Sequence, residues 1–265
     1  MRETLTRTLS GIVYIVLLTL AVFYSYESFL FLFATFLILC VLEYCMLVRI
    51  SHVLPVLAAL ILYVLFAVFD PTPTTDLLLL IVTLLISIQA LFFLFKKFTP
   101  IDRLSKIVYL VGYIILPFVI LTKIPMQDEY NPKVIFSIFL LCWISDTFAY
   151  VVGKSIGRNP LFKSISPKKT IEGFAGGFIF ALIGAYFIAE YFVSQPTYIW
   201  LITAAIVVIF GTLGDLIESK FKRLAEVKDS GKIMPGHGGI LDRLDSVIFA
   251  APFVLLFFQI INYVS

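Results

Sequence analysis

Charged residues are scarce in this chain. They make up 14% of its 265 residues, whereas hydrophobic residues make up 61% and the mean hydropathy is +1.04. In a typical soluble domain, about a quarter of the residues are charged. So large a deficit excludes an ordinary soluble protein. The composition indicates a polytopic membrane protein.

Cysteine and histidine are also rare. The chain has three cysteines and two histidines. Cys40, Cys45 and Cys142 lie within apolar runs and form no Cys-x-x-Cys pair, so we expect buried free thiols and no disulfide framework. Structural and catalytic zinc sites are built mostly from thiolate and imidazole ligands. The shortage of both groups therefore argues against a zinc enzyme.

Long apolar runs dominate the rest of the chain. A helix needs about 20 apolar residues to cross the hydrocarbon core of a bilayer. We expect nine spans, at about 11–24, 28–48, 53–69, 77–95, 105–122, 133–152, 171–193, 198–217 and 245–262. The sequence thus predicts an all-α transmembrane bundle. We interpret residues 1–130 as scaffold helices and residues 131–265 as the catalytic region, with cytoplasmic loops at 153–170 and 218–243.

The positions of the lysines and arginines predict the orientation of the bundle. If the N-terminus is cytoplasmic and nine spans alternate, only Lys123 and Lys133 of the 20 basic residues lie outside. Such a division follows the positive-inside rule. We therefore expect the C-terminus outside the cell. The net charge of +3 then reflects topology, and we expect no nucleic-acid partner.

Basic residues and glycines gather in the two cytoplasmic loops. The basic ones that we consider for substrate binding are Lys168, Lys169, Lys222, Arg223, Lys228 and Arg243. Solvated cations at a membrane surface would account for them without any site. However, Gly231, Gly236, Gly238 and Gly239 accompany them, and glycine lets backbone N–H groups approach an anion closely. The combination favours a phosphorylated substrate that meets the bilayer.

Carboxylates stand at the predicted cytoplasmic ends of three spans. Asp146, Asp215 and Glu218 lie at helix C-termini, where an anion opposes the helix dipole and needs a compensating cation. A neighbouring Lys or Arg, or a metal ion, could supply that charge. Asp242 and Asp245 stand at a helix N-terminus, where simple capping is the alternative to metal binding. Oxygen ligands from Asp146, Asp215, Asp242 and Asp245 suit Mg²⁺.

Two further residues have several interpretations. His237, in the sequence Gly-His-Gly-Gly, could donate to a phosphate, act as an acid or base, or pack the loop. Glu43, near the inner end of the second span, could reach the interface, pair two helices or contact the site. The sequence leaves these alternatives open.

One segment is more specific than any of these features. It reads Ser219-x-x-Lys222-Arg223, then Lys228-Asp229-x-Gly231, then Pro235-x-His237-Gly238-Gly239-x-x-Asp242-Arg243-x-Asp245. This pattern resembles the signature of the phosphatidate cytidylyltransferase, or CDP-diacylglycerol synthase, family. The upstream sequence Ser166-Pro-Lys168-Lys169-Thr170-x-Glu172-Gly173 is also similar. Met234 departs conservatively from the pattern, and the resemblance covers roughly residues 140–250.

The resemblance implies an enzyme that makes CDP-diacylglycerol and pyrophosphate from CTP and phosphatidate, with Mg²⁺ and a second cation such as K⁺ as candidate cofactors. Transfers of this kind depend on positioning and charge neutralisation. It implies catalytic roles for Asp215, Asp245, Lys222, Arg223 and His237. Substrate-binding roles fall to Lys168, Lys169, Lys228, Gly238, Gly239 and Arg243, and metal-binding roles to Asp146, Asp215, Asp242 and Asp245. We expect a bacterial inner-membrane protein whose site faces the cytoplasm, and we consider a homodimer formed through the N-terminal spans.

Two other functions fit the sequence less well. A transporter is expected to carry charged residues or helix breaks near the bilayer midplane, whereas the charges here gather at one face. A CDP-alcohol phosphotransferase would carry an Asp-Gly-x-x-Ala-Arg sequence, which is missing.

Overall fold

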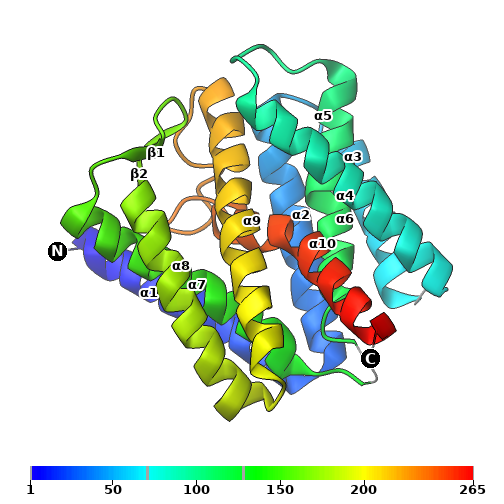
Figure 1. Ribbon diagram of the computed structural model, residues 1–265. Helices are drawn as coiled ribbons and strands as arrows, with labels where there is room; N and C mark the ends of the chain where they lie inside the picture. Colours follow the sequence, from blue (N-terminus) through cyan, green and yellow to red (C-terminus); the bar gives the residue numbers. More distant parts are fainter. Residues whose placement is uncertain (1, 70–71, 127–128, 265) are drawn as a thin grey trace.

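The computed structural model describes residues 2–69, 72–126 and 129–264 as a bundle of helices with one small hairpin (Figure 1). The helices of the N-terminal half are α1 (Arg2–Tyr24), α2 (Tyr26–Val48), α3 (Val53–Tyr63) with the π-helical turn η1 (Val64–Val68), α4 (Pro73–Phe95), and α5 (Arg103–Tyr109), η2 (Leu110–Ile115) and α6 (Leu116–Lys123) in succession. The C-terminal half comprises α7 (Pro132–Ile156), β1 (Pro160–Phe162), β2 (Ser166–Thr170), α8 (Ile171–Phe187) with η3 (Ile188–Val193), α9 (Thr197–Leu224) and α10 (Leu241–Val264).

The helical class predicted from the sequence is confirmed, while the number of spans stays a prediction. Eight helices in the described ranges are long and apolar enough to cross a membrane, and Val53–Val68 is shorter. This short segment runs back along α2. The Tyr63 hydroxyl donates to the carbonyl of Leu30 at 3.0 Å, and the Tyr26 hydroxyl donates to that of Ala67 at 3.4 Å. Its far end thus lies beside the first residue of α2.

Both predicted cytoplasmic loops are more ordered than we expected. The predicted loop 218–243 begins late, because α9 continues to Leu224. Charge does not end a helix, and Lys222 and Arg223 suit its negative C-terminal end. In the predicted loop 153–170, α7 continues to Ile156, and β1 pairs antiparallel with β2. The hairpin corrects the all-α expectation at one place.

Glycines bring α7 and α8 into close contact. A Cβ atom added at Gly177 would lie 2.6 Å from the carbonyl oxygen of Ser145, and one added at Gly173 would lie 2.7 Å from that of Ala149. Small residues permit this approach of two backbones in a membrane. The contact holds the C-terminal part of α7, which carries Asp146, against the start of α8.

The N-terminal and C-terminal halves share one hydrophobic core. The ring of Phe221 on α9 contacts those of Tyr44 on α2, Phe93 on α4 and Tyr113 on η2. Beside it, the buried ammonium of Lys220 donates to the carbonyls of Phe93, Leu94 and Lys96, at the end of α4. The last carbonyls of a helix have no partner within the helix, so Lys220 caps α4 from α9.

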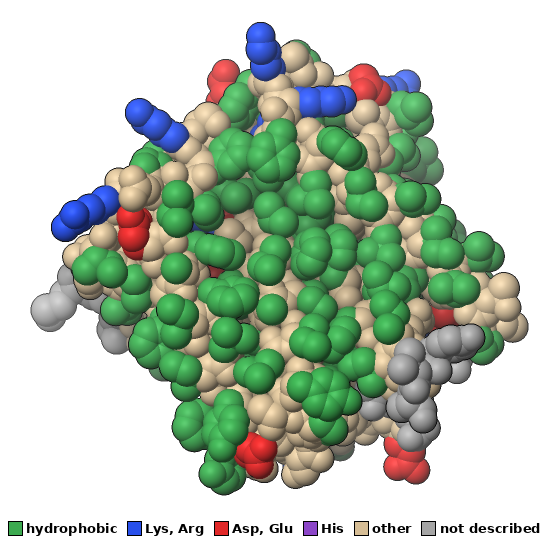
Figure 2. All heavy atoms as spheres, viewed as in Figure 1, with side chains coloured by type: hydrophobic (Ala, Val, Ile, Leu, Met, Phe, Trp, Pro, Cys, Tyr) green, Lys and Arg blue, Asp and Glu red, His purple; other side chains and the backbone are tan. Residues whose placement is uncertain are grey.

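The surface is divided in the way a bilayer requires. Figure 2 shows apolar side chains across the middle of one face, while Lys and Arg gather at the end where α9 terminates and the hairpin lies. Large apolar residues such as Leu85 and Phe92 are well exposed. An exposed apolar belt of this kind is stable against lipid and unfavourable in water.

Candidate functional site

A cavity of about 800 Å³ lies between α7, the β1–β2 hairpin, α8, α9 and the start of α10. It gathers residues far apart in the sequence. Ten of the residues predicted for the site line it: Asp146, Lys168, Lys169, Asp215, Lys222, Arg223, Lys228, Asp242, Arg243 and Asp245. The fold therefore places acidic and basic groups from both predicted loops around one space.

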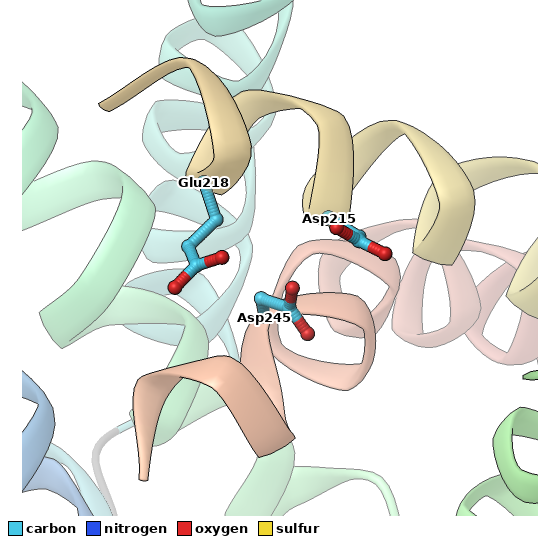
Figure 3. A group of neighbouring side chains, drawn as sticks. All are labelled: Asp215, Glu218 and Asp245. Atoms are coloured by element: carbon cyan, nitrogen blue, oxygen red, sulfur yellow. The ribbon is translucent and has the colours of Figure 1, made fainter. Parts of the chain in front are cut away.

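Figure 3 shows three carboxyl groups that lie together, and two of them, those of Asp215 and Asp245, line this cavity. One oxygen each of Asp215, Glu218 and Asp245 can be chosen so that all three lie within 4.8 Å of one another. Asp215 and Glu218 are three residues apart on α9 and so share a helix face, while Asp245 comes from the first turns of α10. Glu218 is fully buried, and Asp245 is 6% exposed.

Two lysines neutralise part of this negative charge. The ammonium of Lys222 forms an ion pair with Glu218 Oε2 and donates to Asp242 Oδ1 at 2.6 Å. The ammonium of Lys169, on β2, donates to Asp215 Oδ2. Burial alone would lower the pKa of Lys169, but the Asp215 carboxylate outweighs it and the pKa is raised above its ordinary value. Lys169 is therefore an ammonium at neutral pH.

The cluster holds more carboxyl groups than cations. Four carboxyl groups, those of the triad and of Asp242, lie around these two ammonium groups. The Oε1 atom of Glu218 has no hydrogen-bond partner among the residues that the structure describes, while the ammonium of Lys222 lies beside Oε2. A buried carboxyl oxygen without a hydrogen bond is costly. A bound cation would relieve that cost.

The carboxylate cluster differs from the predicted metal set. It contains Asp215 and Asp245, adds Glu218, and includes neither Asp146 nor Asp242 among the described residues. The sequence had drawn attention to Glu218 without assigning it to the site. Its spacing of three from Asp215 was the signal that could have found it, because that spacing puts both carboxylates on one face of a helix.

Both carboxylate oxygens of Asp242 accept hydrogen bonds from neighbouring residues, most of them in its own loop. Besides the contact with Lys222, its Oδ2 atom accepts from the Ser230 N–H at 2.9 Å, the Ser230 hydroxyl at 2.9 Å and the Gly239 N–H at 2.7 Å. These bonds fit the capping alternative better than metal binding. Asp146 is exposed to the cavity from α7 and lies outside the triad.

The Gly-His-Gly-Gly segment is turned away from the cavity lining. His237, Gly238 and Gly239 are not among the described residues that line it. The imidazole Nδ1 atom lies 2.7 Å from the hydroxyl of Ser10 on α1, and the His237 carbonyl accepts from Arg243 at 2.8 Å. Burial, and then Arg243, lower the pKa of His237. These positions favour loop packing, and the three predicted roles in substrate binding or catalysis stay predictions.

Arg223 ties the hairpin to the loop that follows α9. Its Nε atom donates to the carbonyl of Ile165 at 3.3 Å, and its Nη1 atom donates to the carbonyl of Val227 at 3.0 Å. The side chain is exposed, as are those of Lys168 and Lys228. These three cations therefore surround the cavity on its solvent-accessible side, where a phosphorylated molecule can reach them.

Comparisons with known proteins identify related sequences. A model of the Cytidylyltransferase family matches residues 5–261. A phosphatidate cytidylyltransferase of Bacillus subtilis (strain 168) is 43% identical over 162 residues, which are 61% of this chain and 60% of that protein. Those of Staphylococcus haemolyticus and Staphylococcus aureus (strain COL) are 52% and 50% identical over 116 residues, 43% of this chain and 44% of each relative. The matched part thus spans less than two thirds of these relatives.

Proposed function

The chain belongs to the cytidylyltransferase family, and from this premise we propose that it is an integral-membrane phosphatidate cytidylyltransferase. A phosphate oxygen of phosphatidate forms a bond to the α-phosphorus of CTP, the bond from that phosphorus to the β-phosphate oxygen breaks, and pyrophosphate leaves. The products are CDP-diacylglycerol and pyrophosphate. The observation that carries the proposal is the buried carboxylate cluster beside a cavity surrounded by cations.

Asp215, Glu218 and Asp245 are the residues that would hold Mg²⁺. All three offer hard oxygen ligands, which Mg²⁺ prefers, and the Oε1 atom of the buried Glu218 carboxyl group has no hydrogen-bond partner among the described residues. When bound, the ion would neutralise charge on the nucleotide phosphates. A second cation, such as K⁺, stays a prediction.

The cations divide into two groups by position. Arg223 lies in the last turn of α9, the helix that carries Asp215 and Glu218, and Lys228 follows this helix. We assign both to the phosphates of CTP. Lys168 and Lys169 lie on β2, which leads into a helix that borders the bilayer, so we assign them to the phosphate of phosphatidate. Lys222 forms ion pairs with two carboxylates, those of Glu218 and Asp242, and so neutralises part of their charge.

The proposed placement in the membrane follows from the distribution of charge. The end of the bundle that carries the cavity is rich in Lys and Arg (Figure 2), which the positive-inside rule assigns to the cytoplasm. CTP is a cytosolic nucleotide, and phosphatidate lies in the bilayer. The relatives that we compared are bacterial, which supports an inner-membrane location. A homodimer remains a prediction.

The proposed function can be tested with CTP that carries a radioactive label on one chosen phosphate. Purified protein in mixed micelles is incubated with phosphatidate, Mg²⁺ and CTP labelled on either the α- or the γ-phosphate. We expect lipid-soluble label from α-labelled CTP only, because the γ-phosphate leaves with pyrophosphate. Replacing phosphatidate by diacylglycerol should abolish the signal. Absence of lipid-soluble label from α-labelled CTP, with protein shown to be folded, would exclude the proposed reaction.

A further inference from the structure

Glu43 is a buried carboxylate of α2 that contacts the loop between α9 and α10. Its side chain is 0% exposed, so it does not reach toward the interface. Its Oε1 atom accepts from the Ile240 N–H at 3.0 Å, and its Oε2 atom accepts from the Leu241 N–H at 2.8 Å and from the Ser230 hydroxyl at 2.9 Å. Within the described residues, the donors to Glu43 all lie in this loop or at the start of α10.

These bonds cap α10 from another helix. The first N–H groups of a helix lack acceptors within the helix, and a side chain just before the helix usually provides one. Gly239 and Ile240, which precede α10, have no acceptor in their side chains. Glu43 supplies acceptors for two N–H groups that lie 197 and 198 residues away in the sequence. The positive end of α10 in turn stabilises the carboxylate.

The surrounding loop is shaped to this carboxylate. A Cβ atom added at Gly231 would lie 2.7 Å from Glu43 Cδ, and one added at Gly239 would lie 2.6 Å from it. The Ser230 hydroxyl lies 2.9 Å from both Glu43 Oε2 and Asp242 Oδ2. Two glycines and a serine thus place the loop directly against Glu43, so any shift of the carboxylate is passed on to the first turn of α10.

We propose that Glu43 is a positioning residue for the carboxylate cluster. It fixes the first turn of α10, and with it the approach of Asp245 to Asp215 and Glu218. Glu43 itself is not among the described residues that line the cavity, so it acts through α10 and touches no substrate. The inference extends the proposed function, since it concerns the same site.

Cation binding in the absence of substrates tests this proposal. In Glu43→Gln one oxygen is replaced by an amide donor, which faces a backbone N–H and cannot accept from it. Electron paramagnetic resonance of free Mn²⁺ measures affinity for folded protein in detergent. We expect the variant to bind Mn²⁺ about tenfold more weakly, or about 1.4 kcal/mol, and excess Mg²⁺ to restore part of its turnover. Equal Mn²⁺ affinity in the variant and the original protein would overturn the proposal.

Tyr44→Phe is the matched control. Tyr44 is the next residue of α2, and its hydroxyl donates to the carbonyl of Lys106 at 3.0 Å. The control therefore loses a hydrogen bond at the same depth without touching the loop of α10. We expect it to lower the unfolding temperature while leaving Mn²⁺ affinity unchanged. A purely structural role for Glu43 would give the same result in both variants and would contradict positioning.

A second variant covers the case in which Glu43→Gln does not fold. Ser230→Ala removes the hydroxyl that joins Glu43 to Asp242 and keeps the carboxylate itself. We expect Mn²⁺ affinity to fall severalfold, and unchanged affinity would again overturn the proposal. The Mn²⁺ measurement uses neither CTP nor phosphatidate. Failure of cytidylyl transfer in the original protein would therefore refute the proposed function and leave this inference standing.

Discussion

The ion pair between Lys169 and Asp215 creates a competition that one substitution can test. The ammonium of Lys169 occupies Asp215 Oδ2, and Asp215 belongs to the cluster that would hold Mg²⁺. A divalent cation that uses this oxygen must displace the ammonium. Lys169→Met keeps the length of the side chain and removes its charge, so it should raise affinity for a divalent cation.

The structure sets the size of the effect. A hydrogen bond that involves charged groups contributes about 1.5–3 kcal/mol. The side chains of Lys169 and Asp215 are 31% and 26% exposed, so water screens the pair and the lower value applies. About 1.5 kcal/mol corresponds to roughly tenfold in affinity. Because the pKa of Lys169 is raised, the competition should persist across neutral and mildly alkaline pH.

Mn²⁺ titration followed by electron paramagnetic resonance provides the assay. We expect Lys169→Met to bind Mn²⁺ about tenfold more tightly and yet to show a higher KM for phosphatidate, because the variant has no ammonium at this position to contact the lipid phosphate. Lys168→Met is the control, since Lys168 is exposed in the same cavity and no ion pair is described for it. Unchanged or weaker Mn²⁺ binding in Lys169→Met would refute the competition.

Three further predictions concern ligation, packing and pH. Glu218→Gln should weaken Mn²⁺ binding by roughly tenfold, since one charged ligand is lost, and unchanged binding would remove Glu218 from the site. Gly177→Val should lower stability by about 1–3 kcal/mol through overpacking against α7, as thermal unfolding will measure against Ala175→Val on the exposed face of α8. The pKa of His237 is lowered in the folded state, so its contribution to stability is present at pH 7.5 and is lost as pH falls toward 5.5. The unfolding temperature should drop less over that range in His237→Asn, and an equal drop would exclude the histidine as the cause.

Much of the fold could be predicted because apolar runs of about 20 residues have few alternatives to a membrane helix. The ends of the helices were harder. α9 continues through Ser219–Leu224 because helix formation tolerates charge, whereas the predicted span stopped where the apolar run stopped. The β1–β2 hairpin has no recognisable strand pattern in the sequence, because β1 is only three residues long and β2 is mostly polar.

Part of the predicted set of site residues lies together in the structure, while the roles of these residues stay predictions. Residues of the signature loop and of β2 line one cavity. Glu218 was missed as part of the carboxylate cluster, and Gly239 was interpreted as part of a phosphate cradle although Asp242 takes its N–H. The contact of Glu43 with Leu241 crosses 198 residues. No local pattern reports such a contact, because it depends on how α2 and α10 pack.

The cap that α2 provides for α10 has a consequence for the order in which the protein is made. The ribosome completes α2 well before α10, and each emerging helix joins those already inserted. Asp245 and the N–H of Leu241 belong to α10, whereas Glu43 belongs to the earlier helix α2. The carboxylate cluster is therefore assembled only after α10 has been made. A nascent chain halted before residue 241 should be inserted in the membrane yet unable to retain a divalent ion.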